Sequence, residues 1–206
     1  MIAPAHPLFE QPWPEPEGDF RLFQLGHVVD DVVAAALAWV GTFGVGPFHV
    51  LPVVDQRLSY GGAGGEERSI RVQVAVAQAG PVQIELIQQH CTTRSFYRDW
   101  SRNGTSAFHQ VATVTGDYDA KKAHFRAAGH AVVAESLGGR FRVAYVDTVA
   151  AFGFYTEVVE QTPGFLAQLQ TISETCAGWD GSDPVRLLTR DGYRVPEAPD
   201  RPAEGA

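Results

Sequence analysis

The feature that most constrains the fold of this chain is an internal repeat. The stretch "QLGHVVDD" runs from Gln24 to Asp31 and "QVATVTGD" runs from Gln110 to Asp117, so both pairs of residues lie 86 positions apart. Each stretch predicts a strand that leads into a helix, because a short acidic side chain caps a helix N-terminus; in the first copy either Asp30 or Asp31 could be the cap. A chain with such a duplication folds as two similar modules.

The remainder of each copy alternates apolar and polar residues, which predicts strands. "IELIQ" in the first copy matches "TEVVE" in the second and sets Glu85 against Glu157, at an offset of 72 residues. The shortfall of 14 positions falls largely on the glycine-rich stretch "LSYGGAGGEERS", which we predict to be a loop that the second copy lacks. Each copy is therefore expected to contain a strand, a helix and three strands.

The repeat also divides the chain. Residues 1–19 are rich in proline and acids and predict an extended N-terminal arm. Residues 20–100 form the first module with its connection, and residues 101–160 form the second module. Residues 161–206 are expected to hold a helix at "FLAQLQTISETCA" and then a mobile, turn-rich tail.

Charge and composition exclude several classes of function. A formal net charge of −8 argues against nucleic-acid binding, which needs a basic face. No apolar run is long enough to span a membrane, and the N-terminus lacks the pattern of a signal peptide. Cys91 and Cys176 have no CxxC spacing, which favours a reduced, cytoplasmic protein.

In their order and spacing, the repeated stretches together with "GVGPF", "SFYRDW" and "GRFRVAYVDT" resemble the vicinal oxygen chelate superfamily. That superfamily includes glyoxalases, methylmalonyl-CoA epimerases, extradiol dioxygenases and bleomycin-resistance proteins. The resemblance implies an α+β fold in which two βαβββ modules form a curled mixed sheet around one pocket. It also implies a homodimer.

The same resemblance implies a set of site residues. In the family, each module contributes one metal ligand from its first strand, usually a histidine, and one from its last strand. The matching positions here are Gln24, Glu85, Gln110 and Glu157. Amide and carboxylate oxygens suit a divalent cation such as Mg²⁺ or Mn²⁺, with Co or Zn as further candidates, but amides bind more weakly than imidazole. A site without metal is the alternative, and one of the two glutamates would then hold a proton.

Strand alternation places His109 and Gln110 on opposite faces of their strand. We predict that Gln110 faces the pocket and that His109 packs against the helices behind the sheet, unless a one-residue bulge turns His109 inward. Further contacts with substrate are expected from residues near the pocket mouth, on the strands of the glutamates or in the connection between modules: His49, Gln89, Tyr97 and Tyr155.

The implied function is that of a small-molecule enzyme. An isomerase, epimerase or lyase would act through an enolate or alkoxide that a metal ion stabilises, with Glu85 or Glu157 moving the proton. The alternative is a metal-free protein that sequesters a small aromatic or polyketide-like ligand. Extradiol dioxygenase activity is disfavoured, because such iron sites use two histidines and one carboxylate.

Overall fold

The computed structural model describes residues 20–61, 64–100 and 106–196, so the predicted N-terminal arm lies outside the described residues. The first module comprises β1 (Arg21–Val28), α2 (Val32–Phe43), β2 (Phe48–Val50), β3 (Val54–Tyr60), β4 (Glu66–Ala79) and β5 (Val82–Gln89). After the connecting helix α3 (Phe96–Trp100), the second comprises β6 (Ala107–Thr115), α4 (Tyr118–Ala127), β7 (Val132–Ser136), β8 (Val143–Val146), α5 (Val149–Phe152) and β9 (Tyr155–Glu160). This confirms the α+β class.

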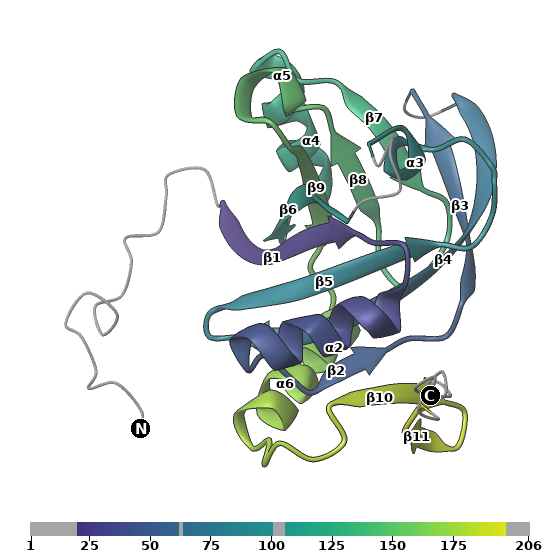
Figure 1. Cartoon of the computed structure of the whole chain (residues 1–206). Coiled ribbons are helices and arrows are strands. Elements are labelled where there is room, and N and C mark those ends of the chain that lie inside the picture. Colours follow the sequence, from purple (N-terminus) through teal and green to yellow (C-terminus); the bar gives the residue numbers. More distant parts are fainter. Residues whose placement is uncertain (1–19, 62–63, 101–105, 197–206) are drawn as a thin grey trace.

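The sheet curls until it closes on itself. Its strands follow one another in the order β1, β5, β4, β3, β7, β8, β9 and β6, and β6 pairs again with β1. The two modules therefore meet twice, at β1 with β6 and at β3 with β7. Helices α2 and α4 pack on the outside of this ring, as Figure 1 shows. The predicted curled mixed sheet is confirmed.

The strand register reproduces the spacing of the repeat. In the first module Gln24 pairs with the residue two positions before Glu85, and in the second Gln110 pairs with the residue two positions before Glu157. Between the modules, Gly26 lies opposite Gln110. The glutamines and glutamates thus occupy equivalent places around an approximate twofold axis.

Each module begins its helix with an aspartate, as the sequence predicts. Asp31, and not Asp30, is the N-cap of α2, and its side chain accepts hydrogen bonds from the backbone of Val33 and Ala34, both at 2.9 Å. Asp117 caps α4 through the backbone N–H of Ala120 at 3.0 Å. Both helices therefore start at the same place relative to the glutamine of the preceding strand.

Two predictions about loops were wrong. The glycine-rich stretch is mostly strand, because β3 continues to Tyr60 and β4 begins at Glu66, and the two strands pair as a long hairpin. The predicted mobile tail contains a second hairpin, β10 (Val185–Thr189) and β11 (Gly192–Arg194). β10 extends the sheet by pairing with β2, and the Asp-Gly turn at Asp191 was the sequence signal for it. Residues 197–206 lie outside the described residues.

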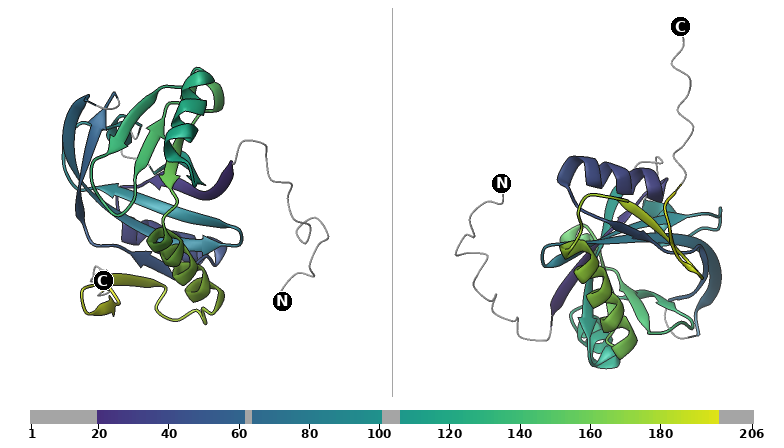
Figure 2. Two further views of the ribbon diagram at one scale, coloured as in Figure 1. Left: turned by 180° about the vertical axis from the view of Figure 1, so that it is seen from behind. Right: turned by 90° about the horizontal axis from the view of Figure 1, so that it is seen from below.

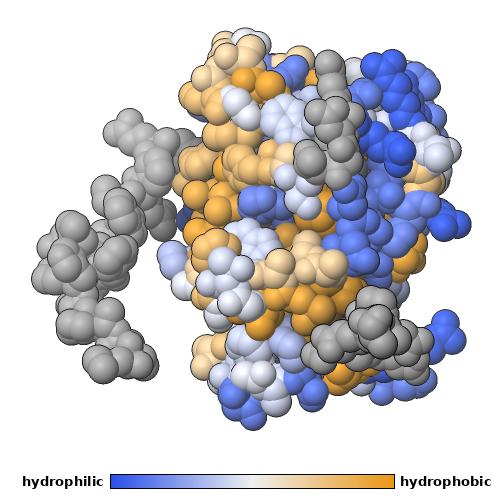
Figure 3. Space-filling view, in the orientation of Figure 1, coloured by the Kyte–Doolittle hydropathy of each residue, from blue (hydrophilic) through white to orange (hydrophobic). Residues whose placement is uncertain are grey.

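The C-terminal helix is α6 (Pro163–Ala177), and it packs on β4. Figure 2 shows it beside the β10–β11 hairpin, and its residues Phe165 and Leu169 reach the same side of β4 as Val72 and Val74, opposite to the side that α2 covers. On the face shown in Figure 3, polar residues gather over the β3–β4 hairpin and apolar residues lie toward β1 and α2. Within the described ranges, no helix is long and apolar enough to span a bilayer.

Candidate active site

A cavity of about 440 Å³ lies inside the closed sheet, and we call it the inner cavity. Phe165 and Leu169 of α6 close one side of it. Its polar lining includes Gln24, Gln83, Glu85, Tyr97, Tyr145 and Glu157. Because aliphatic and phenylalanine side chains form much of the rest of its wall, charges deep in this cavity are poorly solvated.

Two carboxyl groups from opposite modules meet here through one amide. The Nε2 atom of Gln110 donates a hydrogen bond to Glu157 Oε2 at 2.7 Å and to Glu85 Oε2 at 3.2 Å. Gly26 makes this approach possible, since a Cβ atom at that position would lie 2.5 Å from Gln110 Cγ. The glycine therefore provides the space through which the amide reaches both carboxyl groups.

Burial changes the acidity of both carboxyl groups. It raises the pKa of Glu157 to about 7. Burial, followed by the nearby charge of Glu157, raises the pKa of Glu85 well above its usual value, although the hydrogen bond from Gln110 opposes this. Two neighbouring carboxylates in an apolar cavity cannot both ionise cheaply, so the pair holds a proton at neutral pH. One group is then a base and the other an acid.

Two tyrosines extend the network from Glu157. Tyr145 lies opposite Glu157 in the pairing of β8 with β9, and its hydrogen bond favours the ionised form of that glutamate. Tyr97 Oη in turn donates to Tyr145 Oη at 3.0 Å. Burial raises the pKa of both phenols well above 10, so both remain neutral donors. The sequence analysis did not find Tyr145, because strand alternation alone does not reveal which residues face each other across a sheet.

Gln24 does not join the carboxyl groups in this arrangement. Its Nε2 atom donates to Gln83 Oε1 at 2.8 Å, while Gln110 is bonded to both glutamates. The residues opposite the two glutamines also differ, because Gln110 pairs with Gly26 and Gln24 pairs with Ala112. Of the four predicted ligands, the structure thus joins three and places Gln24 beside them in the cavity lining.

The strand of His109 contains a bulge. Gly26 pairs with Gln110 and the next residue of β1 pairs with Phe108, so His109 is the extra residue. The equivalent place in β1, Phe23, is bulged in the same way. The prediction that His109 packs behind the sheet was therefore wrong, because the bulge turns its ring to the same side as Gln110.

His109 holds the amide of Gln110 in place. Its Nδ1 atom lies 2.8 Å from Gln110 Oε1. Because the amide nitrogen of Gln110 donates to the two glutamates, its amide oxygen is the atom that faces His109, and an oxygen can only accept a hydrogen bond. The imidazole proton is therefore on Nδ1. The imidazole is fully buried among the rings of Phe96, Tyr97 and Tyr155. Burial lowers its pKa to about 4, so it stays neutral.

The remaining predicted contacts have different surroundings. Four residues were predicted to contact substrate, and of these only Tyr97 lines the inner cavity. Gln89 donates to the carbonyl of Thr93 at 2.7 Å and so anchors the connection before α3. Tyr155 packs against the ring of His109 and lines a separate shallow pocket. His49 lines a second, larger cavity next to the inner one.

Comparison with known proteins identifies the family. Residues 23–145 match the family model of the glyoxalase/bleomycin resistance protein/dioxygenase superfamily, which is more than half of the chain. The chain belongs to this superfamily. No curated protein sequence matches it.

Solved structures with the superfamily fold are similar to this chain at low identity. Methylmalonyl-CoA epimerase from Mycobacterium tuberculosis is 19% identical and superposes with a TM-score of 0.52 over 78% of this chain and 99% of that one. A methylmalonyl-CoA epimerase in complex with methylmalonyl-CoA and NH4+ is 20% identical, with a TM-score of 0.48 over 70% and 96%. A Streptomyces coelicolor epimerase variant in complex with 2-nitronate-propionyl-CoA is 21% identical, with the same score and coverage. At 19% identity, the likeness to the Mycobacterium tuberculosis enzyme shows a shared fold and no more.

Members of the superfamily commonly use a divalent metal, so we asked whether the side chains in this cavity could bind one. The described residues contain no group of three or more His, Cys, Asp or Glu side chains that could hold a metal ion. Gln110 also presents its nitrogen, not its oxygen, to the two carboxyl groups. In this arrangement the side chains do not fit a divalent cation, because the Gln110 amide directs N–H groups, which cannot bind a cation, toward both carboxyl groups.

Proposed function

We propose that this chain is an isomerase of the epimerase type, which moves a proton at a carbon atom next to a carbonyl group. Glu85 and Glu157 would be its acid–base pair. One observation carries the proposal: the amide of Gln110 bridges the buried carboxyl group of Glu157 and the half-buried carboxyl group of Glu85 in a cavity that a small molecule could enter. Carboxyl groups with raised pKa values near neutrality are suited to proton transfer at physiological pH.

The reaction needs one proton removed and one returned. The ionised glutamate takes the proton from the substrate carbon, and the electron pair of that C–H bond moves toward the carbonyl oxygen to form an enolate. A neutral donor in the cavity, such as the phenol of Tyr145, stabilises the developing charge on that oxygen. The protonated glutamate then delivers its proton to the opposite face of the carbon, which restores the carbonyl and inverts the centre.

The positions of the two glutamates support inversion. Glu85 comes from β5 of the first module and Glu157 from β9 of the second, with β1 and β6 between these strands in the sheet, so two separate carboxyl groups can contact one bound substrate. The fold shared with the Mycobacterium tuberculosis methylmalonyl-CoA epimerase supports the same class of reaction. It also makes acyl-CoA thioesters with a branched α-carbon a reasonable first group of substrates to test.

Deuterium exchange tests the proposal without knowledge of the natural substrate. Purified protein is incubated in D₂O with a panel of branched thioesters and ketones, and ¹H NMR follows loss of the signal at the α-carbon. We expect exchange that falls at least about 100-fold in Glu85→Gln and Glu157→Gln. Glu67→Gln is the matched control, because Glu67 is exposed and pairs with Arg57 at the surface. Exchange that persists in both active-site variants would refute the assignment.

A second function has one observation in its favour, the mostly apolar wall of the cavity. Such a wall suits a protein that sequesters a small aromatic or polyketide-like ligand without converting it. The same experiment separates the two functions, because sequestration predicts tight binding of an aromatic ligand and no exchange with any substrate of the panel.

A further inference from the structure

A second cavity of about 650 Å³ adjoins the inner one, and we call it the outer chamber. The two share part of their walls, including Leu51, Val72 and Phe141. The other side of the outer chamber is built by α6 and by Leu188 and Tyr193 of the C-terminal hairpin. Since the family match ends at residue 145, this side belongs to a part of the chain beyond the matched region.

His49 is a buried polar group of the outer chamber that lacks a partner. Phe48 and Val50 belong to the apolar cluster beneath α2, so strand alternation turns His49 away from that cluster. Its side chain is 2% exposed, its ring meets that of Tyr193 at 5.4 Å, and neither ring nitrogen has a hydrogen-bond partner among the described residues. A buried polar group without a partner lowers stability, so a ligand that supplies the partner would account for a histidine at this place.

The imidazole of His49 can both donate and accept a hydrogen bond. Burial lowers its pKa, an effect that the backbone of Val76 partly opposes and the charge of Arg186 reinforces. The ring is therefore neutral at physiological pH, with a proton on one nitrogen only. It suits an uncharged polar group in the middle of a ligand better than a carboxylate or phosphate.

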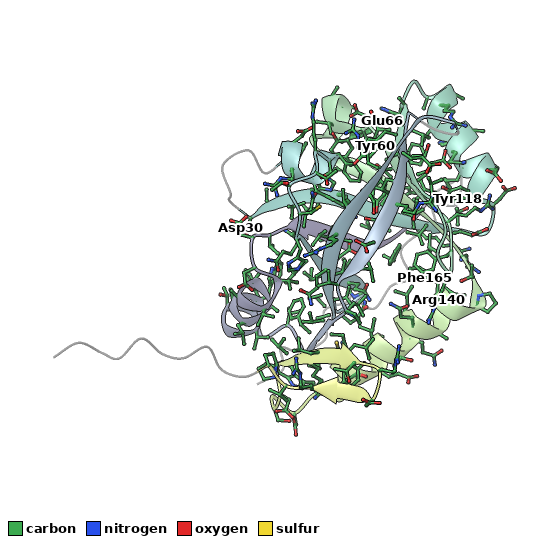
Figure 4. The ribbon with its side chains drawn as sticks, turned by 90° about the vertical axis from the view of Figure 1, so that its right-hand side faces the viewer. Asp30, Tyr60, Glu66, Tyr118, Arg140 and Phe165 are labelled. Atoms are coloured by element: carbon green, nitrogen blue, oxygen red, sulfur yellow. The ribbon has the colours of Figure 1, made fainter. Side chains whose placement is uncertain are left out.

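A cation stands at the rim of the same chamber. Arg140 is exposed and makes no ion pair with any residue that the structure describes. Figure 4 shows it near Phe165, beside α6. In a chain with a net charge of −8, an unpaired guanidinium at the mouth of an apolar chamber is a recognition group for an anion.

We propose that the outer chamber binds the tail of an elongated, acidic carbonyl substrate. An apolar segment of the tail would lie along the hairpin and α6, a polar group would bond to His49, and an anionic group would meet Arg140. The reacting carbon would lie in the inner cavity, next to the carboxyl groups of Glu85 and Glu157, and in this respect alone the inference rests on the proposed function.

Titration with anilinonaphthalene sulfonate, an aromatic anion with an amine, tests the chamber directly. We expect the wild-type protein to bind the dye with enhanced fluorescence, and Arg140→Gln to weaken binding about tenfold through loss of a charge-assisted hydrogen bond. Arg190→Gln is the matched control, because Arg190 is exposed in the turn of the same hairpin and lines neither cavity. Absence of dye binding, or equal affinity of the two variants, would overturn the proposal.

His49→Leu separates a ligand-binding histidine from a structural one. Since leucine removes unpartnered nitrogens, we expect the thermal unfolding midpoint to stay level or to rise, while dye affinity falls several-fold. A large drop in the midpoint with unchanged affinity would show a structural role and refute this part of the inference. Dye binding that depends on Arg140 without deuterium exchange would remove the proposed function and keep the chamber. Deuterium exchange without dye binding that depends on Arg140 would refute the proposed role of the outer chamber and leave the proposed function standing.

Discussion

Replacing Gly26 with alanine is the most direct test of how the active site is assembled. The added methyl carbon would lie 2.5 Å from Gln110 Cγ and 3.0 Å from its Cδ, which is closer than carbon atoms approach in folded proteins. Gly26 lies within β1 and alanine suits a strand backbone, so the effect of the substitution is a steric one on Gln110. The amide would have to leave its position between Glu85 and Glu157.

The expected cost follows from two contributions. Overpacking of a filled interior costs about 1–3 kcal/mol, and the loss of hydrogen bonds to a charged partner costs about 1.5–3 kcal/mol. We therefore expect Gly26→Ala to lower the free energy of unfolding by about 2.5–6 kcal/mol, measured by urea denaturation. In a Gln110→Ala background the clash is absent, so the same substitution should cost less than about 1 kcal/mol.

The matched control is Gly41→Ala. A Cβ atom at Gly41, on α2, has no heavy atom within 4 Å, so alanine there should stabilise the protein by about 0.5–1 kcal/mol through helix propensity. If Gly26→Ala cost as much in the Gln110→Ala background as in the wild type, the clash would lie elsewhere. The account of the bridging amide would then be refuted.

Three further outcomes are expected. Because folding raises the pKa of Glu157 from 4.5 to about 7, the proton on this carboxyl group stabilises the folded protein most below pH 4.5, and this stabilisation is lost as the pH rises to about 7. Glu157→Gln should remove up to about 3 kcal/mol of the resulting pH dependence of the unfolding free energy, measured by urea unfolding at about pH 5 and pH 8. The pH dependence of stability that arises from His109 has the opposite sign, since folding lowers its pKa from 6.5 to about 4 and stability is lost on acidification through that range. ¹⁵N NMR should show a neutral ring protonated on Nδ1 at about pH 5.5, and titration of the ring near pH 6.5 would contradict this. Mg²⁺, Mn²⁺ or a chelator should leave the thermal midpoint unchanged, and a saturable rise with either ion would show that Gln110 turns its oxygen to a cation.

The architecture and the equivalence of the two halves could be predicted from the sequence. The common offset of Gln24 to Gln110 and of Asp31 to Asp117 predicted two modules, and the strand register agrees with it. This succeeded because strand alternation, helix capping and duplication are local properties, which can be read along the chain without knowledge of its packing. The same logic picked out Glu85 on the last strand of the first module.

The tertiary structure alone decided how the side chains meet. The bulge that turns His109 toward Gln110 arises from the pairing of β6 with β1, strands that are far apart in the sequence. The hydrogen bond between Gln110 and Glu157 depends on the space left by Gly26 in another module. The ring of His49 packs against Tyr193 of a hairpin that is far away in the sequence. Contacts of this kind are set by register and volume between distant segments, and no local pattern in the sequence encodes them.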